Sequence, residues 1–400
     1  NDTIVLLRDF EANLTAAWGI NKNLTIKGNY TITFHDYSFG ITGDNTLTLD
    51  GCHIVINNAK HTAYSDNPAN AAIMVNDGAT LTLDNGASLL INSAQGDGIA
   101  TWDSNWKTTD SEHDTRYETI NILNGSTYKY INSSSGGGIE DYNGDPYDMP
   151  TCDVMNIKNN STVEFVKNYS GIVGTWYVNI EDSALVVKNN NGNGSNGSNY
   201  NISNSTVTFD TNGGHGLSAG ELSIDNSTVT ANNNTYIGIA VGNNFTVKNG
   251  AKVTATGNAS DSSYGYAAVR LYNDYKFSVD RTSTLTIKNN YNTGLYVRKG
   301  NLTVEDGAKL EITGNKVSNS KLDGYGGGLY VGYGDNYDPS VTLPANAVIY
   351  NNHSLVGGDD IYVSEGVNGP SLTFGKVGAG WTLDGEPDCE DAIDGWYDDS

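Results

Sequence analysis

A repeat of about 20–25 residues along the chain is the feature that most limits its fold. Each copy begins with a short segment in which apolar and polar residues alternate, as in Leu24–Lys27, Leu47–Asp50, Leu222–Asp225 and Leu302–Glu305. Such period-two alternation is typical of strands with one buried face. A copy this short cannot bury its apolar face alone. The repeat therefore predicts a solenoid in which neighbouring coils cover one another.

Each copy continues with a second alternating segment, an Asn, and a Gly-rich turn that leads into a third segment. The Asn recurs at Asn58, Asn92, Asn132, Asn168, Asn189, Asn212, Asn233, Asn258, Asn289, Asn315 and Asn351. Asn suits tight bends, and stacked amides can hydrogen-bond along the axis, so we expect an internal ladder. Three strands per turn predict an all-β fold: a single right-handed parallel β-helix with three sheets and about 12–13 coils. A β-sandwich would need hairpin pairs, which the repeat lacks.

The spacing of the repeat also predicts the domain organisation. We expect residues 1–23 to form an N-terminal cap and the first strand, and residues 24–383 to form the β-helix. The repeat lengthens near 99–118, 140–153 and 317–338, which predicts loops inserted into the solenoid. The acidic residues 384–400 are expected to be a C-terminal linker or tail.

The charge and the cysteines narrow the choice of partner and compartment. With 22 Lys and Arg against 46 Asp and Glu, the net charge of -24 argues against nucleic acid as a partner. No apolar run is long enough to insert into a membrane. Three cysteines, Cys52, Cys152 and Cys389, cannot form a disulfide framework, and Cys52 lies in an apolar strand where a buried thiol is expected. We expect a secreted, monomeric protein, trimmed of its targeting segment.

Aromatic residues gather in two of the expected insertions. Trp102, Trp106 and Tyr117 lie in the first, and Tyr142 and Tyr147 lie in the second. Exposed aromatic rings among polar groups stack on sugars or anchor protein partners. Because the two insertions leave adjacent coils, we expect them on one side as a ligand-binding surface. The alternative is that the rings only cover the flank of the helix.

Two arginines suggest a second binding position. Arg270 and Arg298 each follow a third strand of the repeat, so we expect them at equivalent places in successive coils, about 4.8 Å apart. Such a pair could hold an anionic sugar or a sulfate. The alternative is a pair of solvated arginines, each paired with a local acid such as Asp274 or Glu305.

A calcium site is a further candidate. Asp141, Asn143 and Asp145 place oxygen ligands at alternate positions, as at the start of a calcium loop. The Gly and the Glu that would complete such a loop are missing. Ca²⁺ is therefore the only cofactor that the sequence suggests, and an ordinary polar turn is the alternative.

Three segments of the chain carry a resemblance to known proteins. Glu311–Lys316, Gly326–Val331 and Gly357–Val363 are similar to the repeats of polymorphic outer-membrane proteins. They also resemble the repeats of β-helical adhesin-like proteins on Gram-positive gut bacteria. The resemblance implies a protein outside the cell, attached to the cell surface or wall, with an adhesin-like role and no defined catalytic residues.

The function that follows from these patterns is binding rather than catalysis. We expect a cell-surface adhesin or binding ectodomain that recognises a glycan or a host protein through its aromatic loops. The alternative is a calcium-dependent polysaccharide lyase or another carbohydrate-active enzyme. His215, in Gly213–Ser218, resembles the Gly-His-Gly segment of polygalacturonases, but the aspartate segments of that family are absent. We therefore expect His215 to lie in an exposed turn and assign no catalytic residue.

Overall fold

In the computed structural model the described residues are 2–60, 71–102, 117–142, 153–260, 267–317, 324–332, 338–364 and 370–374. They form parallel strands, and none of them is helical. No membrane-crossing helix occurs in this part of the chain. The chain divides into two compact units, Asn1–Thr208 and Phe209–Ser400. The prediction of a right-handed parallel β-helix with three sheets is confirmed.

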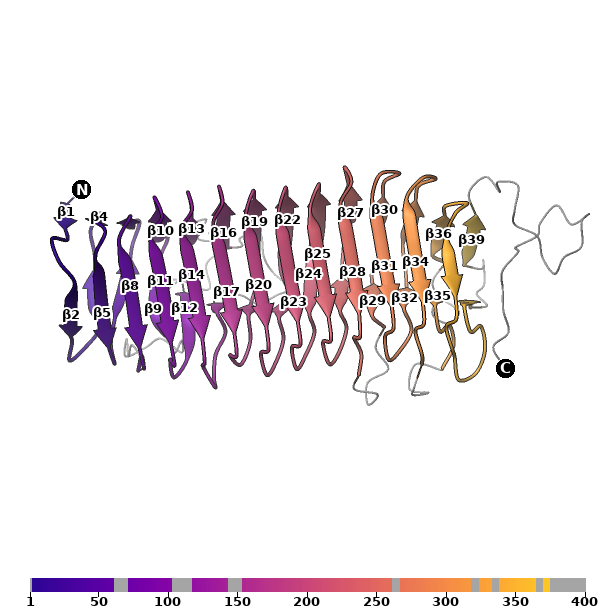
Figure 1. Cartoon of the computed structure of the whole chain (residues 1–400), viewed down its shortest axis with the longest axis horizontal. Helices are drawn as coiled ribbons and strands as arrows, with labels where there is room; N and C mark the ends of the chain where they lie inside the picture. Colours follow the sequence, from indigo (N-terminus) through magenta and orange to yellow (C-terminus); the bar gives the residue numbers. More distant parts are fainter. Residues whose placement is uncertain are drawn as a thin grey trace, which may run out of the picture. The chain divides into compact units, whose positions relative to one another are not determined.

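The first unit has three strands in each coil, and each strand pairs with its counterpart in the next coil (Figure 1). The first sheet contains β1 (Asp2–Val5), β4 (Leu24–Lys27), β7 (Thr46–Asp50), β10 (Thr80–Asp84), β13 (Thr119–Ile122), β16 (Asp153–Lys158), β19 (Trp176–Glu181) and β22 (Ser198–Ser203). The second contains β2 (Phe10–Asn13), β5 (Thr31–His35), β8 (His53–Asn57), β11 (Ser88–Asn92), β14 (Thr127–Ile131), β17 (Thr162–Val166) and β20 (Ala184–Lys188). The third contains β3 (Trp18–Ile20), β6 (Phe39–Thr42), β9 (Ala71–Asn76), β12 (Asp97–Trp102), β15 (Ile139–Asp141), β18 (Ile172–Val173) and β21 (Ser195–Asn196).

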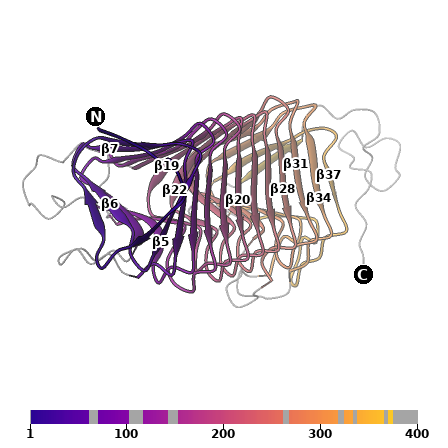
Figure 2. The ribbon, with the colours of Figure 1, turned by 60° about the vertical axis from the view of Figure 1, so that its left-hand side comes forward.

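The second unit keeps three strands per coil, with β23 (Thr206–Asp210) at its boundary, but its first and third strands belong to one sheet, which the long strand β24 joins. Its first strands are the end of β24 (Leu217–Asp225), β27 (Phe245–Lys248), β30 (Lys276–Val279), β33 (Asn301–Val304), β36 (Ser340–Leu343) and β39 (Ser371–Phe374). Its second strands are β25 (Thr228–Asn232), β28 (Lys252–Thr256), β31 (Thr284–Lys288), β34 (Lys309–Thr313) and β37 (Val348–Tyr350). Figure 2 shows β28, β31, β34 and β37 side by side. Its third strands are the start of β24, β26 (Ile239–Val241), β29 (Val269–Leu271), β32 (Leu295–Val297), β35 (Leu329–Val331) and β38 (Ile361–Val363).

The core follows from the alternation in the repeat. Leu47, Leu81 and Ile120 occupy one register column of the first sheet and are fully buried. The polar residues on either side of them, which are threonines except for Asn121, face outward and are half-buried. Cys52 is buried, as expected, but it lies in the turn just before β8 rather than inside a strand.

An internal asparagine ladder is present, but half of its members differ from those expected. Asn168, Asn212, Asn258 and Asn315 are buried and accept from or donate to the next coil, as predicted. In other coils the ladder uses Asn190, Asn234, Asn290 and Asn352. Six of the asparagines expected in the ladder are instead exposed and have a positive φ. Four of them stand just before the ladder residues of their coils: Asn189, Asn233, Asn289 and Asn351. The other two are Asn58 and Asn132. Sequence alone did not separate the buried amide from the left-handed residue beside it.

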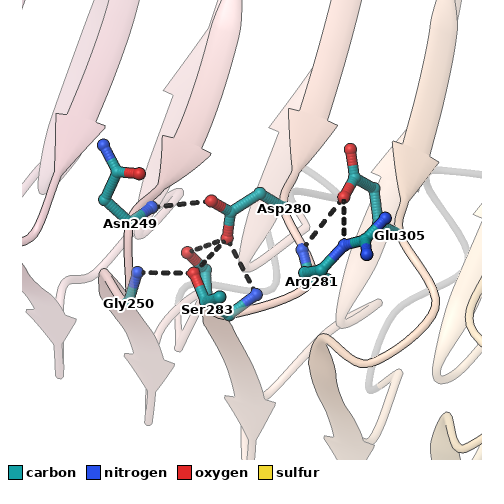
Figure 3. A network of polar contacts seen from close by, with 7 residues as sticks. Asn249, Gly250, Asp280, Arg281, Ser283 and Glu305 are labelled. Carbon is teal, nitrogen blue, oxygen red and sulfur yellow. Dashed lines mark hydrogen bonds and ion pairs between the residues drawn. The ribbon is translucent and has the colours of Figure 1, made fainter.

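One turn between a first and a second strand is built differently (Figure 3). Where several other coils have an Asn or Gly with positive φ, the coil after β30 has Asp280. Its carboxylate accepts from the backbone N–H of Asn249 at 2.7 Å and from the hydroxyls of Thr282 at 2.8 Å and Ser283 at 2.7 Å. The adjacent Arg281 pairs with Glu305 in the next coil, with Nε and Oε2 3.6 Å apart. These contacts make a left-handed residue unnecessary in that turn.

The N-terminal segment takes part in the coil. Residues 1–23, expected to hold a cap and the first strand, contain β1, β2 and β3, which pair with β4, β5 and β6. The acidic segment 384–400 lies outside the described residues, as do Cys152 and Cys389.

Candidate functional site

The third strands of the second unit carry a column of large polar and aromatic side chains. Arg270 in β29, Tyr296 in β32, Tyr330 in β35 and Tyr362 in β38 occupy the same register position. The flanking Val269 and Leu271 are buried in the coil interior, so the alternation of the strand directs Arg270 to the outer face. We call these residues, with Tyr272, Arg298 and His215, the arginine–tyrosine face.

Arg270 is held by two aromatic rings. Its Cζ lies 4.4 Å from the ring centroid of Tyr272 and 5.1 Å from that of Tyr296. Its Nε is buried and has no hydrogen-bond partner within the described part of the chain. Attraction between a cation and aromatic rings holds the guanidinium, and a hydrogen bond to Tyr272 adds to it. The side chain is therefore ordered in advance, and its Nε donor is left unsatisfied.

Arg298 does not occupy the place in the coil that was expected. Leu271 pairs with Val297, so Arg298 stands beside Tyr272, two residues further along the strand direction than Arg270. The expectation of equivalent positions was wrong because Val269 begins β29 whereas Val297 ends β32, so the two Val-Arg dipeptides lie two register positions apart. Both arginines nevertheless act on Tyr272, since each lowers its pKa against the larger effect of burial, which raises it. Glu305, a suggested partner of these arginines, pairs with Arg281 instead.

His215 lies close enough to Arg270 for their charges to interact. Burial lowers the pKa of His215, and the positive charge of Arg270 lowers it further, so the imidazole is neutral at pH 7. Its ring meets that of Tyr236 edge to face at a centroid distance of 5.6 Å. The expectation of an exposed turn was wrong: His215 is half-buried on the arginine–tyrosine face.

The tyrosines beyond Arg270 stack on one another. The rings of Tyr296 and Tyr330 are 4.8 Å apart and inclined by 23°, and those of Tyr325 and Tyr362 are 4.2 Å apart and inclined by 14°. Tyr296 is fully buried, and 4% of Tyr330 is exposed. Because their faces meet other rings, these two tyrosines offer no open face on which a sugar could stack.

The first unit brings together part of the expected aromatic surface. Trp102, at the end of β12, and Tyr142, just after β15, both pack on Ala71, Met74 and Ala100. These two rings partly cover the third sheet. Tyr117 is exposed. Trp106 and Tyr147 lie outside the described residues.

Two carboxyl groups beside Tyr142, the buried Asp97 and the half-buried Glu140, were not predicted from the sequence. Asp97 is 1% exposed, and its carboxylate accepts from Gly137 N–H at 2.6 Å and from the Tyr142 hydroxyl at 2.9 Å. Burial, and then its hydrogen bond to Asp97, raise the pKa of Glu140 to about 8. Burial also raises the pKa of Asp97. The two groups therefore share a proton near neutral pH.

A second such pair lies nearby in the same unit. Asp153, at the start of β16, accepts from the backbone N–H of Glu118 at 3.1 Å, and Glu118 accepts from Gly78 N–H at 3.1 Å. Burial and the charge of Glu118 raise the pKa of Asp153. The sequence signal for both pairs was weak. Asp97, Glu118 and Asp153 stand at or just before the start of a strand, and Glu140 lies in a strand of three residues, so a polar residue is ordinary at all four positions.

The expected calcium ligands are only partly within the described structure. Asp141 ends β15, whereas Asn143 and Asp145 lie outside the described residues. Among the described side chains, no group of three or more His, Cys, Asp or Glu is placed to hold a metal ion.

Comparison with known proteins gives one distant likeness. No family model matches the chain. No curated protein matches it either. A crystal structure of a double mutant of a periplasmic alginate epimerase is similar at 11% identity and a TM-score of 0.31, over 87% of this chain and 76% of that one. The resemblance to adhesin-like surface proteins thus has no matching family behind it.

Proposed function

We propose that the chain binds an acidic polysaccharide and that Arg270 contacts a carboxylate of the bound sugar. The observation that carries this proposal is the guanidinium held by Tyr272 and Tyr296, with a buried Nε that has no hydrogen-bond partner among the described residues. A guanidinium offers donors in one plane that match a carboxylate with two parallel hydrogen bonds. An arginine fixed before binding loses less conformational entropy when the ligand arrives.

Arg298 supplies a second positive charge on the same face. It stands beside Tyr272, diagonal to Arg270, so two anionic groups of one polymer could be met at two points. A uronate polymer carries such groups at regular intervals. Two contacts of moderate strength on one chain give a higher avidity than either alone.

The aromatic residues of the first unit would add a separate contact. Trp102 is partly exposed and Tyr117 is exposed, and rings of this kind bind sugars or protein partners. We also propose that the protein is a monomer and acts outside the cell, attached to the cell surface or wall. This part rests on the sequence resemblance.

Binding to matched polymers tests the proposal. Polygalacturonate carries a carboxylate on every sugar, and its fully methyl-esterified form is the same polymer without the charge. We expect the wild type to bind the first and Arg270→Ala to lose about ten-fold or more in affinity, as expected when a charged hydrogen bond is removed. Arg281→Ala is the matched control, because Arg281 is an exposed arginine of the same unit. Equal binding of the charged and the esterified polymer, or an equal loss of affinity in Arg270→Ala and Arg281→Ala, would show that Arg270 does not contact the ligand's carboxylate.

A second candidate function is supported by the position of His215. A neutral imidazole beside a guanidinium suits removal of the C5 proton of a uronate, since Arg270 would neutralise the carboxylate and His215 would accept the proton. The electron pair left on C5 then either expels the C4 oxygen or takes a proton back from the opposite face. The first outcome is a lyase reaction and the second is epimerisation.

Two readouts separate these chemistries from binding alone. A lyase produces unsaturated ends that absorb in the ultraviolet, and an epimerase exchanges the C5 proton with deuterium from D₂O. We expect either signal to disappear in His215→Asn while binding to the polymer persists. If neither signal arises with polygalacturonate or alginate, the chain binds the polymer without cleaving or epimerising it.

A further inference from the structure

We infer that Tyr296, Tyr330 and Tyr362 form a stack that positions the Arg270 guanidinium for its anionic ligand. This inference rests on the proposed function and adds positioning residues to it. The starting observation is the register: the three tyrosines and Arg270 stand at the same position of four successive third strands.

Each member of the stack contacts the next. Arg270 lies over the ring of Tyr296, and Tyr296 stacks on Tyr330. Tyr330 meets Tyr362 edge to face, with centroids 5.4 Å apart and planes inclined by 71°. Tyr325 closes the far end by stacking on Tyr362. Ala267 packs against Tyr296 and Tyr330 and fills the space beside them.

The stack limits the rotation of Tyr296. The ring of Tyr330, 4.8 Å from that of Tyr296, prevents Tyr296 from tilting toward it. Tyr296 therefore keeps the Arg270 guanidinium in contact with both Tyr272 and Tyr296. Arginine loses up to about 2 kcal/mol of side-chain entropy when it is ordered. If the stack orders Arg270 in advance, the ligand does not have to supply that free energy on binding.

Tyr330 is the informative residue, because it lies two strands from Arg270, at roughly 10 Å. Its hydroxyl is not required by the inference, and its ring is. We expect Tyr330→Leu to weaken binding of polygalacturonate about five-fold, mostly through faster dissociation, and Tyr330→Phe to leave it unchanged. Tyr350→Leu, at an exposed tyrosine of the same unit, is the control.

A double-mutant cycle keeps this effect apart from general loss of stability. If Tyr330 acts through Arg270, Tyr330→Leu should cost nothing further in the Arg270→Ala background. The Hε resonance of Arg270 should also broaden or exchange faster in Tyr330→Leu, in the absence of ligand. A five-fold loss that persists in the Arg270→Ala background would overturn the positioning role. An Arg270→Ala variant that binds like the wild type would instead remove the proposed function itself.

Discussion

The amide of Asn258 makes several buried hydrogen bonds at once. Its Oδ1 accepts from the backbone N–H of Asn234 at 3.1 Å and from the Asn234 side chain at 3.0 Å. Its Nδ2 donates to the carbonyl of Ala231 at 2.7 Å. The side chain of Asn258 therefore links neighbouring coils. Without it, the buried polar groups of Asn234 and Ala231 would lose a hydrogen-bond partner that water cannot replace.

We expect Asn258→Ala to lower the free energy of unfolding by about 3 kcal/mol, since it leaves several buried groups unsatisfied. The matched control is Asn233→Gly, at the exposed residue with φ 52° just before the ladder, where glycine keeps the backbone conformation. That change should cost less than about 1 kcal/mol. Urea unfolding of both variants measures the difference. Similar midpoints for the two would mean that the ladder adds little.

The ladder shows how far residues can be assigned from sequence. An Asn-Asn pair at the end of a second strand predicts a tight bend and a buried amide, but both residues fit both roles. Asn289 took the left-handed position and Asn290 the buried one. Only the register with the neighbouring coil decides between them. The repeat therefore predicted the existence of the ladder, and the structure was needed for half of its members.

Strands β12 and β15 contain the shared proton of Asp97 and Glu140. The pKa of Glu140 is raised in the folded chain from 4.5 to about 8. Its contribution to stability is fully present below pH 4.5 and is lost as the pH rises through about 8. The raised pKa values of Asp97 and Asp153 act in the same direction.

We therefore expect the third sheet of the first unit to be about 2–4 kcal/mol less protected at pH 9 than at pH 5. Hydrogen exchange of the amides of β12 and β15, corrected for the intrinsic rate, measures this difference. Glu140→Gln removes a titrating group and should flatten the profile. A wild-type profile as flat as that of the variant would contradict the shared proton.

The turn around Asp280 should depend on pH in the opposite direction. Hydrogen bonds from the Ser283 hydroxyl and the Asn249 N–H lower the pKa of Asp280 to about 2, although its slight burial opposes them. Its stabilising effect is present above pH 3.8 and is lost as the pH falls through about 2. Because Asp280 is half-buried and water screens its charge, we expect Asp280→Asn to cost only about 1 kcal/mol at pH 7 and clearly less at pH 2. Urea unfolding at the two pH values tests this, and an equal cost at both would contradict it.

At the scale of elements, the sequence predicted strands well and pairing less well. The alternation that defines β29 and β32 is plain in the sequence. Arg298, however, lies two residues beyond Tyr296, which is the residue that pairs with Arg270. Pairing offsets depend on inserted residues between strands, which periodicity does not count. The Asp97–Glu140 pair was missed for the same reason, since the two residues lie 43 positions apart and meet only through the stacking of coils.

For the molecule as a whole, the net charge of -24 opposes the approach of an acidic polymer. The attraction of Arg270 and Arg298 for a bound carboxylate acts at contact, whereas the repulsion between the acidic chain and the polymer acts over the Debye length. Because this length falls from about 30 Å to about 8 Å between 10 and 150 mM salt, added salt weakens the repulsion more than the attraction. We expect the association rate with polygalacturonate to increase over this range, unlike that of most charged complexes. Biosensor kinetics at several salt concentrations measure this. A rate that falls steadily from low salt would indicate a ligand attracted by the overall field.

The ladder of the second unit also bears on how such a chain can change in length. Each of Asn258, Asn290 and Asn315 accepts from the coil before it and donates to the coil after it. A tandem duplication of one complete coil would bring its own donor and its own acceptor, so no neighbour would be left unsatisfied. Beyond Asn352 the series of amides ends at Asp360, whose Oδ1 accepts from the backbone N–H and the side chain of Asn352. Extra coils can therefore be copied in ahead of Asp360, in whole multiples of the repeat, and a fractional insertion would break the series.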